Sequence, residues 1–398
     1  MSLKKFRICC SMEEVEKLKQ DIVDYNNNPK APSDSEEEIS ENFEKSKDAS
    51  ENAEETSQSS GMSSERESAG TSEEDFEKKD MKKSACLTCA TLEKFFDACL
   101  SGDIDDLKNL VEVVDVNEKA PSGSSGLHMA AQEGHLEIVD WIIENGGDVN
   151  ILCRRKTTPL HTAAMCGYIK IVETLTKNGA DIEAKAEKNT TPLMAALERG
   201  YPEIAMFLVK IGANINSATK DGWTPLHLAS GKGFFEVVEC LIAKEAKINT
   251  KGEMGETPLH VALQHDQNKI VEYLIMKGAD VNVKSKIKDW TPIHHAAMCK
   301  SPANVEILIK NGANIDAKAD RGCTPLMLAS QIGHLEMVNM LVQLGAQVNV
   351  IGNANGRNVS PLWLALDCGH NDVVKYLLEH GANPDDLTPK IVRIILHF

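Results

Sequence analysis

A four-residue pattern of the type Thr-Pro-Leu-His recurs along this chain at an almost constant interval. Its first residue, Ser or Thr, stands at positions 125, 158, 191, 224, 257, 291, 324 and 360, so the intervals are 33, 33, 33, 33, 34, 33 and 36 residues. A unit of about 33 residues cannot bury its own apolar face, so neighbouring units must stack and share one core. The sequence therefore predicts an elongated repeat scaffold with a long surface for other molecules.

Each unit carries the signals of two short helices. In the second unit, Thr158 suits a helix N-cap, and Pro159 suits the first helical position, where its missing N–H is no loss. Gly167 and Gly179 are placed to end the first and second helix in a left-handed conformation. Apolar residues of the second helix follow the helical period. The polar segments between units predict turns or hairpin loops, called fingers below.

These units closely resemble ankyrin repeats. The best-matching tetrapeptides are Thr158-Pro159-Leu160-His161, Thr224-Pro225-Leu226-His227, Thr257-Pro258-Leu259-His260 and Thr291-Pro292-Ile293-His294. Met194, Met327 and Trp363 replace the histidine elsewhere. Every unit has an alanine two residues beyond the histidine position, where a small side chain lets adjacent helices approach. The resemblance covers about residues 91–386 and implies an all-α fold, an α-solenoid of about eight ankyrin repeats with short β-hairpin fingers.

The chain is expected to consist of four segments. Residues 1–90 form a mostly disordered tail, because residues 33–77 hold 16 acidic against 3 basic side chains and little apolar content. A capping box and an apolar stripe predict a short helix at 12–25. Residues 91–123 follow the helix-pair pattern without the tetrapeptide and are interpreted as a degenerate capping repeat. The array occupies 124–386, and the apolar residues 387–398 form a helix or truncated repeat.

The acidic tail has two interpretations. It either solvates the chain or folds back onto basic fingers at Arg154, Arg155, Lys156 and Lys188 and screens them. Acidic residues three positions beyond several hydroxyl side chains suit an acidophilic kinase, which would add further negative charge. The predicted phosphorylation sites are Ser33, Ser35 and Ser72, together with Thr71.

Chemistry other than binding has little support in the sequence. Five of the twelve histidines stand in tetrapeptides, where the ankyrin resemblance implies hydrogen bonds between repeats. Cys86-x-x-Cys89 is a lone pair and a weak metal or redox signal. There is no phosphate loop, nucleophile motif or long apolar run. We therefore expect no enzyme activity, cofactor, metal, membrane span or nucleic-acid partner, and a monomeric array in the cytoplasm or nucleus.

The ankyrin resemblance implies that fingers and first helices line a concave groove for protein partners. Trp223 and Trp290 are expected as exposed aromatic anchors, the type of residue that often dominates an interface. The alternative is that each indole packs on the next finger. The predicted partner-binding residues are Arg154, Arg155, Lys156, Met165, Lys188, Trp223, Met254, Trp290 and Met298.

The middle of the array departs from the repeat pattern. Asp266 and Lys300 replace the glycine between the two helices, and Glu245 replaces the glycine that ends the second helix. One extra residue precedes Trp290. A non-glycine residue at positive φ costs about 1 kcal/mol, so the turns at Asp266 and Lys300 are expected to adopt another shape. This irregularity suggests a partner site near Trp290, with neutral drift as the alternative.

One modification signal is more specific. Leu274 and Asp280-Val281 precede Asn282 at the spacing favoured by the asparaginyl hydroxylase that modifies ankyrin repeats. The alternative is a purely structural asparagine. Taken together, the sequence predicts a non-enzymatic protein-binding scaffold or adaptor. The alternative is a substrate-recognition subunit of a larger enzyme assembly, such as a ubiquitin ligase.

Overall fold

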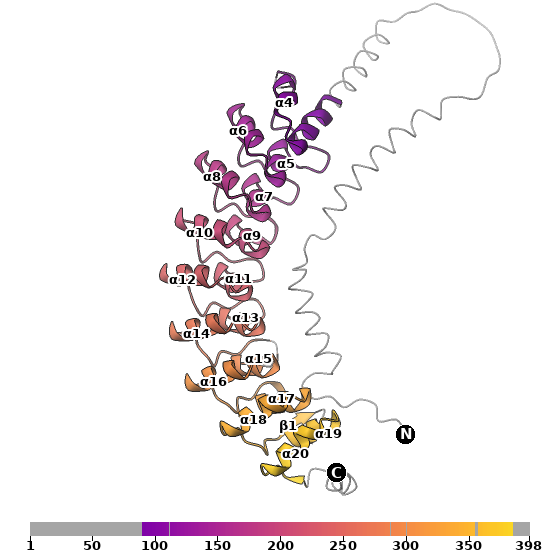
Figure 1. The fold of residues 1–398 in the computed structure, drawn as a ribbon, viewed down its shortest axis with the longest axis vertical. Helices are drawn as coiled ribbons and strands as arrows, with labels where there is room; N and C mark the ends of the chain where they lie inside the picture. Colours follow the sequence, from indigo (N-terminus) through magenta and orange to yellow (C-terminus); the bar gives the residue numbers. More distant parts are fainter. Residues whose placement is uncertain (1–89, 111, 287, 300, 355–356, 385–398) are drawn as a thin grey trace, which may run out of the picture. The chain divides into compact units, whose positions relative to one another are not determined.

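The structure is a computed structural model that describes residues 90–384 apart from 111, 287, 300 and 355–356 (Figure 1). The expected helix at 12–25, the acidic segment 33–77 and the terminal segment 387–398 lie outside the described residues and stay predictions. The chain divides after Asp181 into two compact units. The part described up to Asp181 is called the N-terminal unit here, and the part from Ile182 onward the C-terminal unit.

The N-terminal unit consists of short helices arranged in pairs. Residues 90–101 are helical. The helices that follow are α4 (Ile104–Leu110), α5 (Gly126–Glu133), α6 (Leu136–Glu144), α7 (Pro159–Cys166) and α8 (Ile169–Lys177). Phe95, Phe96, Cys99 and Leu107 are buried in the first pair, which supports the interpretation of residues 91–123 as a degenerate repeat without the tetrapeptide.

The C-terminal unit continues with the same pairing. Its first helices are α9 (Pro192–Arg199), α11 (Pro225–Lys232), α13 (Pro258–Gln264), α15 (Pro292–Met298), α17 (Pro325–Ile332) and α19 (Pro361–Asp367). Its second helices are α10 (Pro202–Lys210), α12 (Phe235–Ala243), α14 (Asn268–Met276), α16 (Pro302–Lys310), α18 (Leu335–Gln343) and α20 (Asn371–Glu379). Successive pairs stack side by side within each unit, as Figure 1 shows. The fold is thus the predicted all-α solenoid.

The tetrapeptide performs the expected capping. Thr158 has extended backbone angles, its side chain accepts a hydrogen bond from the His161 amide, and Pro159 opens α7. Gly167 ends α7 in the left-handed region at φ 88°. The alanines pack at the centre, since Ala130, Ala163 and their counterparts are fully buried. The capping signals of the sequence and the packing of the helices therefore agree in each repeat.

The fingers are tighter than the predicted β-hairpins. Among the described residues, regular strands occur in the last finger, where β1 (Gly352–Ala354) pairs antiparallel with β2 (Arg357–Val359). Lys119 and Ser125 form an isolated bridge in the first finger. Two fingers contain a single 3-10 turn, η1 (Glu187–Asn189) and η2 (Asp320–Gly322). A connection this short closes with one or two hydrogen bonds, which is too few for a ladder.

The prediction about the turn at Asp266 was wrong. Asp266 keeps the left-handed conformation of the glycines it replaces, with φ 56°. Its amide donates to the carbonyl of Leu263. Helix α13 ends at Gln264 and is therefore one residue shorter than α7. Glu245 likewise keeps φ at 65°. Aspartate tolerates this region better than most residues, and the neighbouring helices hold both positions in place. Lys300 lies outside the described residues.

Candidate protein-binding surface

A backbone hydrogen bond closes the base of each finger from the second to the seventh. In the finger before the second repeat, the Cys153 amide donates to the Thr157 carbonyl at 3.0 Å. The same bond joins Thr219 to Trp223 and Gly252 to Glu256. In the sixth finger the bond spans one residue more, from Ser285 to Trp290 at 2.8 Å. The extra residue of the 34-residue interval is therefore accommodated inside this loop.

Fingers of the C-terminal unit are also tied to one another through the backbone. The carbonyls of Lys188, Asp221, Met254 and Lys288 each accept a hydrogen bond from an amide in the next finger, at 2.7–2.8 Å. These four residues stand at the finger tips and are called the finger ridge below. Lys188 and Asp221 are exposed, and the Met254 side chain is 48% exposed. The ridge thus offers charged and apolar side chains from a fixed backbone.

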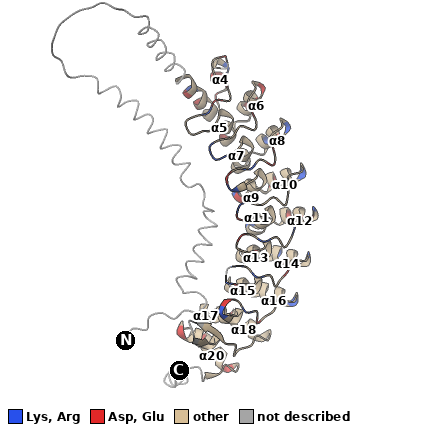
Figure 2. Cartoon of the chain, turned by 180° about the vertical axis from the view of Figure 1, so that it is seen from behind, with Lys and Arg blue, Asp and Glu red and all other residues tan. Residues whose placement is uncertain are grey.

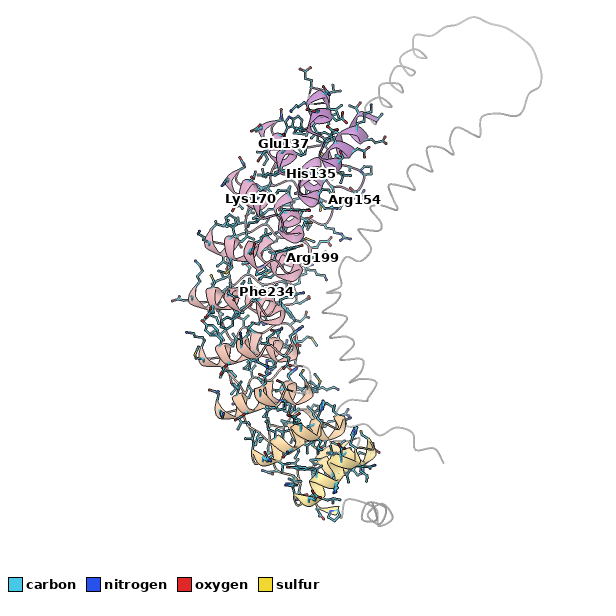
Figure 3. All side chains as sticks on the ribbon, viewed as in Figure 1. His135, Glu137, Arg154, Lys170, Arg199 and Phe234 are labelled. Atoms are coloured by element: carbon cyan, nitrogen blue, oxygen red, sulfur yellow. The ribbon has the colours of Figure 1, made fainter. Side chains whose placement is uncertain are left out.

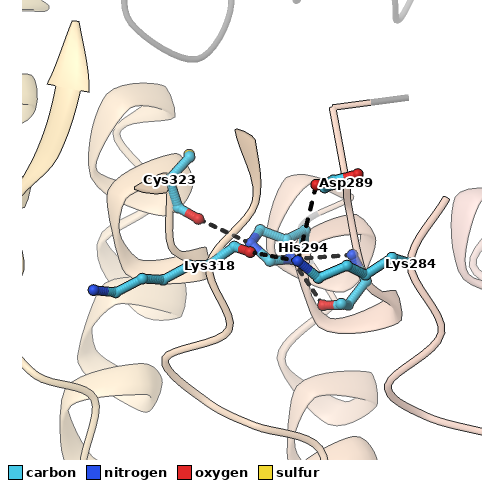
Figure 4. A network of polar contacts seen from close by, with 6 residues as sticks. Lys284, Asp289, His294, Lys318 and Cys323 are labelled. Carbon is cyan, nitrogen blue, oxygen red and sulfur yellow. Dashed lines mark hydrogen bonds and ion pairs between the residues drawn. The ribbon is translucent and has the colours of Figure 1, made fainter. Parts of the chain in front are cut away.

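A polar network joins the sixth and seventh fingers below this ridge (Figure 4). The Lys284 ammonium donates to the Lys318 carbonyl at 3.2 Å and lies 3.9 Å from the Asp289 carboxylate. His294 shares a hydrogen bond of 3.2 Å between its Nε2 and the Cys323 carbonyl. The network fixes the base of both fingers, because it connects side chains of one finger with main-chain atoms of the next.

The basic finger of the N-terminal unit comprises Arg154, Arg155 and Lys156, whose role in partner binding stays a prediction. Arg154 and Lys156 are exposed, Arg155 is half-buried, and Lys156 adopts a left-handed conformation at φ 58°. Figure 3 shows Arg154 on the loop before α7. Met165 is half-buried near the end of α7. These positions are compatible with partner contact.

The two tryptophans differ from the prediction. Trp290 is only 3% exposed, so the expectation of an exposed anchor was wrong. Its ring stacks on His294 and meets His295 edge-on at 5.2 Å. Trp223 is half-buried and stacks on His227 with ring centroids 5.9 Å apart. The residue just before the Ser/Thr position faces the first helix of its own repeat, which is why both indoles turn inward.

Met298 was also misplaced by the sequence argument. It is 3% exposed and belongs to the core rather than to an adaptable groove floor. It ends α15, which is one residue shorter than α7, so its environment differs from that of the half-buried Met165. The sequence spacing placed Met298 on the correct helix, but it did not predict that the side chain lies on the buried side of that helix.

Asn282 is held by two structural hydrogen bonds. Its side-chain amide donates to the Gly312 carbonyl at 3.0 Å, and its Oδ1 accepts from the Asn314 amide at 3.1 Å. Asn150 and Asn249 make equivalent bonds to residues 29 and 31 positions further along the chain. This supports the structural interpretation, while hydroxylation of the exposed Asn282 stays a prediction. Ser33, Ser35 and Ser72 lie outside the described residues.

Tetrapeptide histidines connect neighbouring repeats. In His128, His227 and His294, Nε2 lies 3.0–3.2 Å from a carbonyl 29 residues further on. Burial lowers the pKa of each of these rings to about 4, against an ordinary value of 6.5. A neutral ring can serve both ends of this bridge without placing a charge in the core. Their role is structural, as the ankyrin resemblance implied.

Two carboxyl groups beside the first helices were missed from the sequence, those of the half-buried Glu198 and the buried Glu256. Burial raises the pKa of Glu198, at the end of α9, despite nearby Arg199, Lys188 and Lys232. Burial also raises the pKa of Glu256, which receives a side-chain hydrogen bond from Gln264. A positive charge on a binding partner would stabilise the ionised form of such a carboxyl group. Only the break in the surrounding pattern of small and apolar residues could have revealed them.

The charged side chains follow the repeat as well (Figure 2). Lysines occupy the last turns of α8, α10 and α16, where positive charge complements the helix dipole. Among the described residues, no group of three or more His, Cys, Asp or Glu side chains could hold a metal ion. The helices in this part of the chain are all too short or too polar to span a bilayer.

Comparison with known proteins gives the same classification. The family model "Ankyrin repeats (3 copies)" matches residues 95–186, 193–285, 259–352 and 293–388. A mouse receptor-interacting serine/threonine-protein kinase 4 is 34% identical over 67 residues, which are 17% of this chain and 8% of that protein. An ankyrin repeat protein of Rickettsia bellii is 44% identical over 48 residues, 12% of this chain and 14% of its own. The chain thus matches only a small part of either relative, whereas the family model covers most of the helical array. This chain belongs to the ankyrin repeat family.

Proposed function

We propose that this chain is a non-enzymatic scaffold or adaptor that binds partner proteins through the finger ridge and the adjoining first helices. Ankyrin repeats generally mediate protein–protein interaction. The observation that carries the proposal here is the chain of backbone hydrogen bonds between fingers, from Lys188 to Lys288. It presents exposed side chains on a surface that is already ordered, which lowers the entropy cost of binding.

The ridge combines the features of a protein interface. Lys188 and Asp221 offer charges, and Met254 offers a flexible apolar group among them. The half-buried Trp223 lies one finger away from Met254, and the half-buried Glu198 supplies a carboxyl group near the end of α9. We infer that a partner would be recognised by mixed polar and apolar contacts rather than by charge alone.

Affinity capture with two matched triple variants tests the proposal. The ridge variant carries Lys188→Ala, Met254→Ala and Lys288→Ala. The control variant carries Lys210→Ala, Met276→Ala and Lys310→Ala, which removes the same side-chain types from exposed positions near the ends of second helices. Proteins captured by the wild type and the control but lost from the ridge variant would support this surface. Equal capture by all three would reject it.

A further inference from the structure

The interface between the fifth and sixth repeats is built differently from its neighbours. It joins α13 and α14 to α15 and α16, all within the C-terminal unit. Three positions that are apolar or glycine in most other repeats, those of Asp266, His295 and Asn304, carry polar side chains here and lie beside the polar Gln264 and Ser301. We call this group the polar seam; it consists of Gln264, Asp266, His295, Ser301 and Asn304.

Asn304 is a buried amide at a position that is otherwise apolar. The equivalent residues in other repeats are Ile138, Ile171, Ile204, Val237, Ile270, Met337 and Val373. Asn304 has no exposed surface. Its Nδ2 donates to Asn268 Oδ1 at 2.8 Å and lies 3.4 Å from Asp266 Oδ1. Its Oδ1 has no hydrogen-bond partner among the described residues. A buried acceptor without a donor weakens the folded interface.

Two imidazoles lie in the same interface, and one of them, His295, has a ring nitrogen without a partner among the described residues. The Thr257 amide donates to His260 Nδ1 at 3.2 Å, so the neutral ring carries its hydrogen on Nε2. In other repeats this Nε2 reaches a carbonyl of the next finger. The finger that follows the fifth repeat is one residue longer, and the His260 ring interacts there with the backbone of both Trp290 and Val283.

His295 lies on the other side of the seam. Its Nδ1 lies 3.3 Å from Gln264 Nε2, an amide donor, so its hydrogen also stands on Nε2. That Nε2 is buried and has no partner in the described part of the chain. The rings of His260 and His295 meet edge-on with centroids 5.2 Å apart. Among the described residues, the seam therefore holds one donor, His295 Nε2, and one acceptor, Asn304 Oδ1, that water would satisfy.

The turn at Asp266 removes a packing contact as well. At Gly233 and Gly333, an added Cβ would lie 2.5 Å from Gln267 and 2.3 Å from His370, so a side chain of the next repeat covers each glycine. Asp266 occupies the corresponding position in the fifth repeat, and the corresponding residue of the sixth repeat is the small Ser301. Both changes leave the seam with less side-chain cover than its neighbours.

We propose that the polar seam is the point at which the C-terminal unit opens, with α13 to α16 opening locally while the helix pairs α9 to α12 and α17 to α20 stay folded. Opening gives water access to Asn304 Oδ1 and to Nε2 of His295. The preceding interfaces retain apolar residues at the Asn304 position, so they lack this reason to open. The seam thus provides a built-in place for the array to flex.

Hydrogen–deuterium exchange on the full chain tests this directly. Amides of α13 to α16 should exchange about tenfold faster than those of α9 to α12, because local opening exposes them without global unfolding. Asn304→Ile restores the residue found in other repeats and should slow exchange of α13 to α16 about tenfold. Val237→Ile makes an apolar change at the same position of the fourth repeat and should leave α13 to α16 unchanged.

A second repair keeps the test informative if isoleucine is too large at this site. Asp266→Gly combined with Ser301→Gln recreates the arrangement of Gly233 and Gln267 and should also slow exchange across the seam. Equal protection of α9 to α12 and α13 to α16 in the wild type would overturn the proposal. Folded repair variants with wild-type exchange rates would overturn it too.

Discussion

The indole of Trp290 lies nearly parallel to the imidazole of His294, with ring centroids 6.4 Å apart and an angle of 13° between the planes. Because Trp290 is buried, replacing it with alanine should destabilise the protein by about 3–5 kcal/mol. Trp223→Ala should cost less, since that indole is half-buried. Urea denaturation of both variants followed by circular dichroism measures the difference. A Trp290→Ala protein as stable as the wild type would contradict the inward orientation.

Acid should weaken the array in a defined window. Burial lowers the pKa of His128, His227, His260 and His294 to about 4 in the folded protein, whereas the unfolded value is 6.5. A depressed histidine pKa means that protonation favours the unfolded chain, so stability is complete above pH 6.5 and falls as the pH drops toward 4. Each ring should contribute on the order of 3 kcal/mol to this loss.

The chain contains a natural control for the acid prediction. Met194 and Met327 occupy the histidine position in the third and seventh repeats and are fully buried there. His294→Met should therefore fold and should show a shallower decrease in stability between pH 6.5 and 4. Thermal melting at several pH values in this range measures the slope. An unchanged slope would show that His294 is not held neutral by burial.

Substitutions at two glycines can distinguish the cost of backbone strain from the cost of side-chain crowding. Gly134 and Gly146 have nearly the same positive φ, 84° and 86°. A Cβ at Gly134 would lie 2.3 Å from the Tyr168 ring, whereas Gly146 has open space. Gly146→Ala should cost about 1–2 kcal/mol from the left-handed conformation alone, and Gly134→Ala should cost more. Equal destabilisation in chemical denaturation would mean that Tyr168 moves away freely.

The reverse substitution should stabilise the protein. Glu245 stands where other repeats end the second helix with glycine, and it has φ 65°. Glu245→Gly relieves a left-handed side chain and should add about 0.5–1 kcal/mol to the free energy of unfolding. Lys244→Gly, at the preceding residue with φ −94°, is the control and should not stabilise. A fall in melting temperature for Glu245→Gly would contradict this reasoning.

Helix positions followed from local chemistry. Helix α7 begins after the N-cap Thr158 with Pro159 and ends at the left-handed Gly167. Such helix-end signals depend on only a few neighbouring residues, so the sequence alone is enough to predict them. The direction of Trp290 and Met298 depends on the neighbouring helices, so periodicity could not supply it. Asp266 shows the same limit, because packing keeps a left-handed turn that intrinsic preference disfavours.

The polar seam could be located in the sequence only after the fold was known. Asn304 stands out because aligned repeats show isoleucine, valine or methionine at its position. Its significance depends on an unpaired oxygen, which is a property of three-dimensional packing. The candidate binding surface divides in the same way: exposure at Lys188 and Met254 agreed with the sequence argument, and burial at Trp290 did not.

The hydrogen bonds that join successive fingers use main-chain atoms alone. Lysine, aspartate and methionine stand at equivalent tips along the finger ridge, and the backbone register is the same beneath each of them. Mutation can therefore change the side chains of this ridge without altering the backbone geometry that presents them. A descendant of this protein could exchange one partner for another while its fold stayed untouched.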